Sequence, residues 1–156
     1  MVNNSTDKWN FINTSEYGGP TSGGRNVPTY IPQEVVRIIE PVMKALSETK
    51  NTVLVAGVRE VIRTIIGLLL QLNRSNLEIG NLPPLIGANL EDGTFLMEWL
   101  WPNYRVGFII DPNPKDSIWY LIKRGESSDS NLSGGLNSRE GREALSQLIS
   151  YVALNS

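Results

Sequence analysis

Residues 91–111 read EDGTFLMEWLWPNYRVGFIID, and this stretch decides the fold. Within it, two runs place side chains of different character alternately on the two sides of an extended chain, with the period of two that is typical of a β-strand. The runs cover 94–101 and 104–111, and the Pro102-Asn103 pair between them is typical of a turn. The stretch therefore predicts a β-hairpin.

The expected turn also determines which side chains share a face of the hairpin. With a two-residue turn at Pro102 and Asn103, Leu100 pairs with Arg105. Glu98 then lies diagonal to Arg105 on the same face, within reach of a long side chain. We expect a solvated cross-strand ion pair, and the alternative is a carboxylate and a guanidinium presented to a partner.

Further strands flank the hairpin on both sides. Leu85–Leu90 is short and apolar, and it leads into the Glu91–Gly93 turn. On the other side, DPNPKD at 111–116 is a turn and SIWYLIK at 117–123 is a strand. Residues 124–137 are rich in Ser and Gly and are expected to form a loop. The four strands predict an antiparallel meander.

Two helices are expected before this sheet. Residues 32–48 carry one apolar stripe at spacings of three and four, with Pro41 in the middle, so the helix should kink there or split in two. A second helix is expected from Thr52, taken as its N-cap, to about Asn73.

A last helix should close the chain, because Asn137 and Glu140 resemble a capping box before an apolar stripe. The fold class is therefore α+β, a four-stranded antiparallel β-meander packed against the N-terminal helices and one C-terminal helix. Residues 1–30 are rich in Asn, Ser, Thr and Gly, so we expect a flexible N-terminal arm followed by a single α+β domain over 31–156.

Two features suggest association with another chain. The arm carries aromatic side chains, Trp9, Phe11 and Tyr17 among them, which a plain linker rarely contains. The second helix is apolar nearly all round over 65–72, and such a helix is either central in its domain or covered by another chain. In a chain of 156 residues full central burial is demanding, so we expect association with a protein partner or a second copy.

The composition excludes much catalytic chemistry. The chain has no cysteine and no histidine, so thiol nucleophiles, disulfides, thiolate zinc sites and histidine-dependent triads cannot be built from it. An enzyme would need carboxylates or an oxygen-ligated divalent cation, with Glu98, Asp92 and Asp111 as candidates. The net charge of −2 does not favour nucleic acid.

Several residues of 82–122 carry a resemblance, namely Pro84, Asp92, Gly93, Glu98, Trp99 and Ile110. They form a proline-preceded strand, an Asp-Gly turn, an apolar–Glu–Trp strand and a strand of alternating aliphatics. This pattern resembles small uncharacterised bacterial proteins with an Asp-Gly…Glu-Trp β-meander. The resemblance implies a fold rather than an activity, because its residues are turn and core residues.

We interpret the chain as a non-enzymatic protein-binding module, either an accessory subunit of a complex or an antitoxin- or immunity-type neutraliser. A carboxylate- or metal-dependent enzyme is the alternative, and a nucleic-acid-binding protein is the second alternative. We expect no catalytic residue, metal or cofactor, no transmembrane segment and a cytoplasmic location. The expected partner-binding residues are Trp9, Phe11, Tyr17, Ile65, Leu69, Leu72, Glu98, Trp101 and Arg105.

Overall fold

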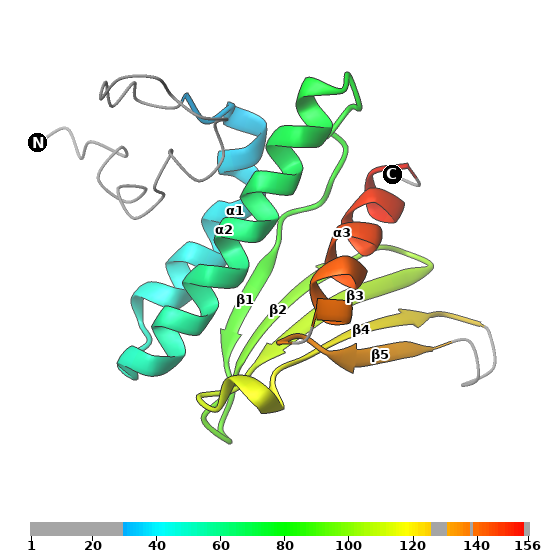
Figure 1. Cartoon of the computed structure of the whole chain (residues 1–156). Helices are drawn as coiled ribbons and strands as arrows, with labels where there is room; N and C mark the ends of the chain where they lie inside the picture. The colour runs from blue at the N-terminus through cyan, green and yellow to red at the C-terminus, as the bar shows by residue number, and fades with distance from the viewer. Residues whose placement is uncertain (1–29, 126–130, 138, 155–156) are drawn as a thin grey trace, which may run out of the picture. The chain divides into compact units, whose positions relative to one another are not determined.

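The computed structural model describes residues 30–125, 131–137 and 139–154 (Figure 1). The elements, in chain order, are α1 (Gln33–Ser47), α2 (Thr52–Arg74), β1 (Ile86–Asn89), β2 (Phe95–Leu100), β3 (Tyr104–Ile110), the 3-10 turn η3 (Pro114–Asp116), β4 (Ile118–Lys123), β5 (Leu132–Gly135) and α3 (Arg139–Leu154). The fold is therefore α+β, as the sequence predicts. The arm expected over residues 1–30 lies outside the described residues except for Tyr30, which is exposed.

The strands form one antiparallel sheet in the order β1-β2-β3-β4-β5, which is the meander expected from the alternating runs. The expectation of four strands is wrong, because a fifth strand, β5, pairs with β4 inside the stretch expected to be a loop. Gly134 makes this pairing possible. A Cβ there would lie 2.9 Å from Nε1 of Trp119, so only glycine lets the strand approach the indole so closely.

The central hairpin has the expected register. Leu100 pairs with Arg105, and the backbone N–H of Trp101 donates to the carbonyl of Tyr104 at 2.9 Å. At the preceding turn Gly93 has a φ of +87°, a left-handed conformation that glycine adopts without strain. The turn residues thus set the register on both sides of β2.

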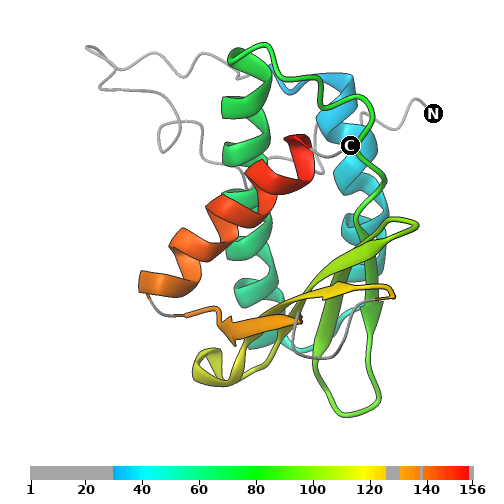
Figure 2. The ribbon, with the colours of Figure 1, turned by 90° about the vertical axis from the view of Figure 1, so that its right-hand side faces the viewer.

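All three helices pack on one face of the sheet (Figure 2). Gly87 of β1 is so close to α1 that a Cβ there would lie 2.9 Å from the Cα of Val42. Gly57 of α2 abuts Ile110 at the end of β3 in the same way. From α3, Tyr151 contacts the ring of Tyr104 edge to face, with ring centroids 5.7 Å apart.

The helix boundaries refine the sequence expectations. α1 is one continuous helix through Pro41, so of the two expected alternatives, a kink or a split, the split does not occur. Pro41 has no backbone N–H, so one intrahelical hydrogen bond is lost, but the helix does not end there. α2 is capped by Asn51 rather than Thr52, since the Asn51 side chain accepts hydrogen bonds from the backbone N–H groups of Val53 and Leu54 at 3.0 and 3.2 Å.

The apolar stretch 65–72 of α2 lies inside the domain. Ile65, Ile66 and Leu69 are fully buried, because α1, α3 and β3 all pack against α2. The expectation that Ile65 and Leu69 meet a partner is therefore wrong for the folded chain. No helix in the described part is long and apolar enough to cross a membrane.

The covered face of the sheet is rich in aromatic side chains. Trp99 is fully buried, and its indole N–H donates to the carbonyl of Pro83 at 3.0 Å. Its ring contacts Phe108 edge to face, with centroids 6.4 Å apart. Tyr104 stacks on Trp101 with centroids 4.6 Å apart, and within the described part its buried hydroxyl has no hydrogen-bond partner.

The buried hydroxyl of Tyr104 leads to a prediction about pH. Burial, followed by the influence of Tyr151, raises the pKa of Tyr104 to about 12. The folded state therefore favours the neutral phenol more than the unfolded state does. The free energy of unfolding should be retained below the ordinary tyrosine pKa of about 10 and should fall as the pH rises from about 10 towards 12. Urea unfolding across this range measures the loss.

The matched variant for this prediction is Tyr104→Phe. It removes a buried hydroxyl that has no partner, so at neutral pH its free energy of unfolding should be unchanged or raised by up to about 1 kcal/mol. Above pH 10 it should lose less stability than the wild-type chain. An identical alkaline loss in both proteins would show that Tyr104 does not titrate as a buried group.

Candidate protein-binding face

The sheet has a second face that no described helix covers. We call it the outer face, and it consists of Ile86, Ala88, Leu96, Glu98, Leu100, Arg105, Gly107, Ile109, Ile118, Tyr120, Ile122, Ser133 and Gly135. The strand registers place these side chains on the other face of the sheet from the buried aromatic side chains. Three large hydrophobic residues on it are well exposed, since Ile86 and Leu100 are each 45% and Ile118 is 38% accessible.

A polar cluster lies in the middle of this apolar surface. The hydroxyl of Tyr120 donates to Oε1 of Glu98 at 2.7 Å, and Nε of Arg105 lies 3.6 Å from the same oxygen. Gly107 makes the cluster possible, because its Cα pairs with Tyr120 across β3 and β4 and a Cβ there would clash with the phenol ring. The tyrosine side chain can thus pass over β3 to reach β2.

The cluster is partly shielded from water. The side chain of Glu98 is 12% exposed, while that of Arg105 is 51% exposed. Burial, and then the hydrogen bond to Glu98, raises the pKa of Tyr120 well above its usual range. Tyr120 therefore stays a neutral hydrogen-bond donor at physiological pH, and Glu98 is held by a hydrogen bond from Tyr120 of β4 and an ion pair with Arg105 of β3.

The expected partner-binding residues fall into separate groups. Glu98 and Arg105 meet on the outer face, as the turn geometry predicts. Trp101 is half-buried and stacks on Tyr104, which belongs to the covered face, so it does not join them. Leu72 is half-buried on α2, away from the outer face. The remaining expected residues, Trp9, Phe11 and Tyr17, lie outside the described residues.

The carboxylates considered for an enzyme serve local structure. Oδ1 of Asp92 accepts hydrogen bonds from the backbone N–H and the hydroxyl of Thr94 at 3.0 and 2.6 Å, and these bonds lower the pKa of Asp92. Asp111 accepts from the backbone N–H of Asn113 at 2.7 Å. Across residues 30–125, 131–137 and 139–154, no three His, Cys, Asp or Glu side chains gather closely enough to hold a metal ion.

Sequence reasoning missed Tyr120 as a member of the cluster. It also missed the exposed aliphatics Ile86 and Ile118, which it treated only as strand residues. One signal was present, since Gly107 interrupts a run of large residues, and glycine inside a strand often marks a close approach. Identifying Tyr120 as the approaching residue needed the pairing of β3 with β4, which the sequence does not specify to the residue.

No protein-family model matches the chain, and comparisons with curated proteins and with solved structures give no match. The resemblance of residues 82–122 to small bacterial proteins therefore stays a prediction that rests on the quoted residues.

Proposed function

We propose that this protein works by binding another protein through the outer face of its sheet. The observation that supports the proposal is a largely aliphatic sheet face that none of the described helices covers, with the hydrogen-bonded Glu98 and Tyr120 and the ion-paired Arg105 at its centre. An exposed apolar patch rimmed or punctuated by polar groups is typical of an interaction surface. An accessory subunit or a neutralising partner would use such a face.

The aliphatic part of the face would supply the binding free energy. Ile86, Leu100 and Ile118 lie on β1, β2 and β4, so they are spread over most of the width of the sheet. Each is more than a third exposed, and covering a large aliphatic side chain contributes about 25 cal/mol per Å² of buried apolar area. The central cluster would add specificity, because a partner must match its charges and donors.

The charge on the face favours a protein partner over a nucleic acid. Its charged side chains are Glu98 and Arg105, one of each sign, and they already interact. A phosphate backbone is bound by groups of Lys and Arg, each of which adds to the salt dependence of binding. The face has no such excess of positive charge among its residues, so association with protein should depend weakly on salt.

The proposal predicts that charges introduced on the outer face weaken binding. In the double variant Leu100→Asp with Ile118→Asp, two exposed hydrophobic contacts are replaced by carboxylates that would have to be desolvated. Binding should weaken at least about tenfold, which corresponds to about 1.4 kcal/mol. Quantitative mass spectrometry of tagged chains captured from the host cell measures how much partner protein stays bound. Light scattering of the purified chain measures its self-association.

The matched control is Leu132→Asp. Leu132 is 53% exposed and lies in the same sheet, but it pairs with buried Leu121 and so faces the helical side. The proposal is supported if the wild-type chain and the control retain a bound protein, or a second copy of the chain, at constant stoichiometry and the double variant loses it. A companion retained equally by all three chains would place the binding surface elsewhere and overturn it.

A further inference from the structure

The outer face is more apolar than the water-facing side of an antiparallel sheet usually is. Such a sheet ordinarily alternates along each strand, with apolar side chains on the covered face and polar ones on the other. Here the central strands carry large apolar side chains on both faces, since β2 reads FLMEWL, β3 reads YRVGFII and β4 reads IWYLIK. Strands of this composition are typical of sheets that are covered on both sides, so a second layer is expected over the outer face.

Strand pairing arranges the outer face in three rows that run across the strands. The first row is Ile86, Glu98, Gly107, Tyr120 and Ser133, the second is Ala88, Leu96, Ile109, Ile118 and Gly135, and the third is Leu100, Arg105 and Ile122. The central strand of the sheet, β3, contributes the middle residue of every row. A two-fold axis parallel to β3 would therefore lay each row on the same row of a second copy, in reversed order.

The two edges of the outer face differ in side-chain size. β1 contributes Ile86 and Ala88, whereas β5 contributes Ser133 and Gly135. The reversed order lays Ile86 over Ser133 of the second copy, and it lays Ala88 over Gly135 of the second copy. The edge with larger side chains thus meets the edge with smaller ones, and the symmetry repeats this fit at the other side. Packed sheet faces interdigitate in this way.

The charges of the face also suit a second copy. The reversed order lays Glu98 over Tyr120 of the second copy, so the two carboxylates do not face each other. Arg105 lies on the central strand, diagonal to its own Glu98 on one side and to the second copy's Glu98 on the other. It contacts its own Glu98 through Nε and is half-exposed, so its terminal nitrogens can donate to the second copy's carboxylate. The carboxylates then offset the repulsion between the two guanidinium groups.

The extent of the outer face fits a small dimer interface. The sheet has five strands, and β2 and β4 have six residues each, so the face measures about 20 Å in both directions. Two such faces in contact would bury on the order of 1,000 Å² in total, which is where specific interfaces begin. A dissociation constant in the micromolar range is therefore expected, and not a tighter one.

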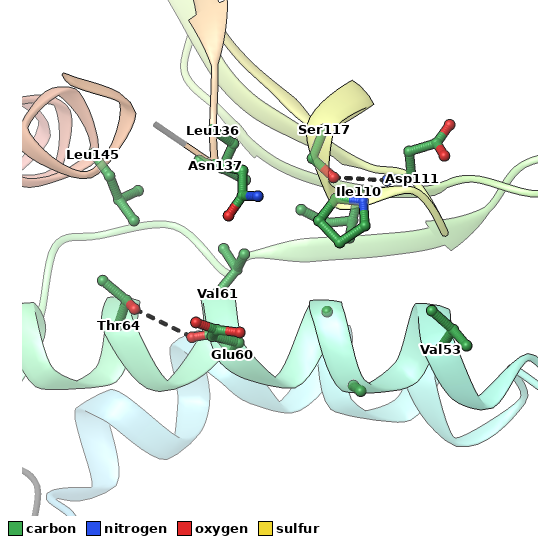
Figure 3. Close-up of a pocket in the computed structure, with 13 residues that line it drawn as sticks. Val53, Glu60, Val61, Thr64, Ile110, Asp111, Ser117, Leu136, Asn137 and Leu145 are labelled. Atoms are coloured by element: carbon green, nitrogen blue, oxygen red, sulfur yellow. Dashed lines mark hydrogen bonds between the residues drawn. The ribbon is translucent and has the colours of Figure 1, made fainter. Parts of the chain in front are cut away.

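The helical side of the domain is less suited to such a self-contact. A pocket of about 320 Å³ opens there, with α2 on one side and the end of β3, the η3 turn and the segment after β5 on the other (Figure 3). A two-fold axis at the pocket would lay this hollow on the identical hollow of a second copy and leave a void, which costs packing. Self-association is therefore expected through the outer face.

We propose that two copies of this chain pair through their outer faces, about a two-fold axis parallel to β3. The inference rests on the protein-binding function proposed for the outer face, and it names the partner as a second copy of the chain. Ile86 of each copy then covers Ser133 of the other. Within one chain these two residues lie on the opposite edge strands β1 and β5, so they cannot contact each other.

The test is analytical ultracentrifugation of the purified full chain over concentrations that bracket the micromolar range. The wild-type chain should shift from its mass of 17.3 kDa to twice that mass. Ile86→Lys changes an exposed side chain and places an ammonium group over Ser133 of the second copy, so the dissociation constant should rise at least about tenfold. Adding Ser133→Glu should recover about three- to tenfold, because a carboxylate then faces each ammonium group across the interface. The recovery should largely vanish in about 1 M salt.

The matched control adds Leu132→Glu to Ile86→Lys. Leu132 is the neighbour of Ser133 in β5 and is exposed, but it faces the helical side, so its replacement should recover nothing. Equal recovery by the two carboxylates would overturn the inference, as would a dimer that Ile86→Lys leaves unchanged.

A wild-type chain that stays monomeric at every concentration would also overturn it, whether a different protein or residues 1–29 of the same chain cover the face. The proposed function fails separately. A monomeric chain that captures another protein from its host, and loses it in the double variant Leu100→Asp with Ile118→Asp, would retain that function while excluding the second copy.

Discussion

Trp99→Ala is expected to lower the free energy of unfolding by about 3–5 kcal/mol, the cost of removing a large, fully buried aromatic side chain. The loss has two sources. The cavity removes the packing of the indole on Phe108, and the carbonyl of Pro83 loses its donor at 3.0 Å. Urea denaturation followed by far-ultraviolet circular dichroism measures the change, with the slope checked for two-state behaviour.

The control for this variant is the next residue in the chain. Leu100 faces the opposite side of the sheet and is 45% exposed, so Leu100→Ala should cost less than about 1 kcal/mol. Equal losses for the two variants would contradict the assignment of the two faces. The comparison uses the alternation of one strand, so it tests which face is covered.

Gly107→Ala is expected to lower the free energy of unfolding by about 2–3 kcal/mol. The new Cβ would clash with the ring of Tyr120, which must then leave its place above β3. Displacing it breaks the hydrogen bond to Glu98 at 2.7 Å. The pKa of Tyr120, which burial and this bond hold high, should move back towards its ordinary value. Urea denaturation measures the stability, and ultraviolet absorbance titration reads the tyrosine pKa.

Gly135→Ala is the matched control, since Gly135 is another strand glycine of the same sheet and a Cβ there meets nothing within 4 Å. It should change the free energy of unfolding by no more than about 1 kcal/mol and leave the tyrosine titration unchanged. If Gly107→Ala behaved like this control, the proposed path of Tyr120 over Gly107 would be wrong.

The core hairpin was predictable from sequence because its signals are local. The alternation over 94–101 and 104–111, with a two-residue turn between them, predicts both the faces and the register. The ion pair between Glu98 and Arg105 follows from that register alone. Short-range pairing rules were therefore sufficient for two of the three residues of the central cluster.

The fifth strand was not predictable because its residues have low strand propensity. The sequence LSGG of β5 contains neither alternating hydrophobic residues nor β-branched ones. Its place depends on the indole of Trp119 in the neighbouring strand, which only a glycine at position 134 accommodates. The need for glycine therefore arises from a contact with another strand and not from the local sequence. Read locally, the same glycines are equally typical of a loop.

The location of the apolar stretch 65–72 was also beyond the sequence. A helix that is apolar on most sides needs cover, but its pattern does not say whether the cover comes from its own chain or another. Here α1 and α3 flank α2 while the sheet lies beneath it, so Ile65 and Leu69 are fully buried. The surface that we propose for a partner is instead the outer face, to which all five strands contribute residues.

Hydroxyl-radical footprinting of the outer face tests the central claim most directly. The tagged chain is oxidised free and in the assembly captured from its host, and modification is read residue by residue. The account predicts protection of Leu100, Ile118 and Tyr120 on the outer face, with Leu132 and Tyr151 on the helical side unchanged. Protection of Leu132 or Tyr151 with the outer face still reactive would contradict it.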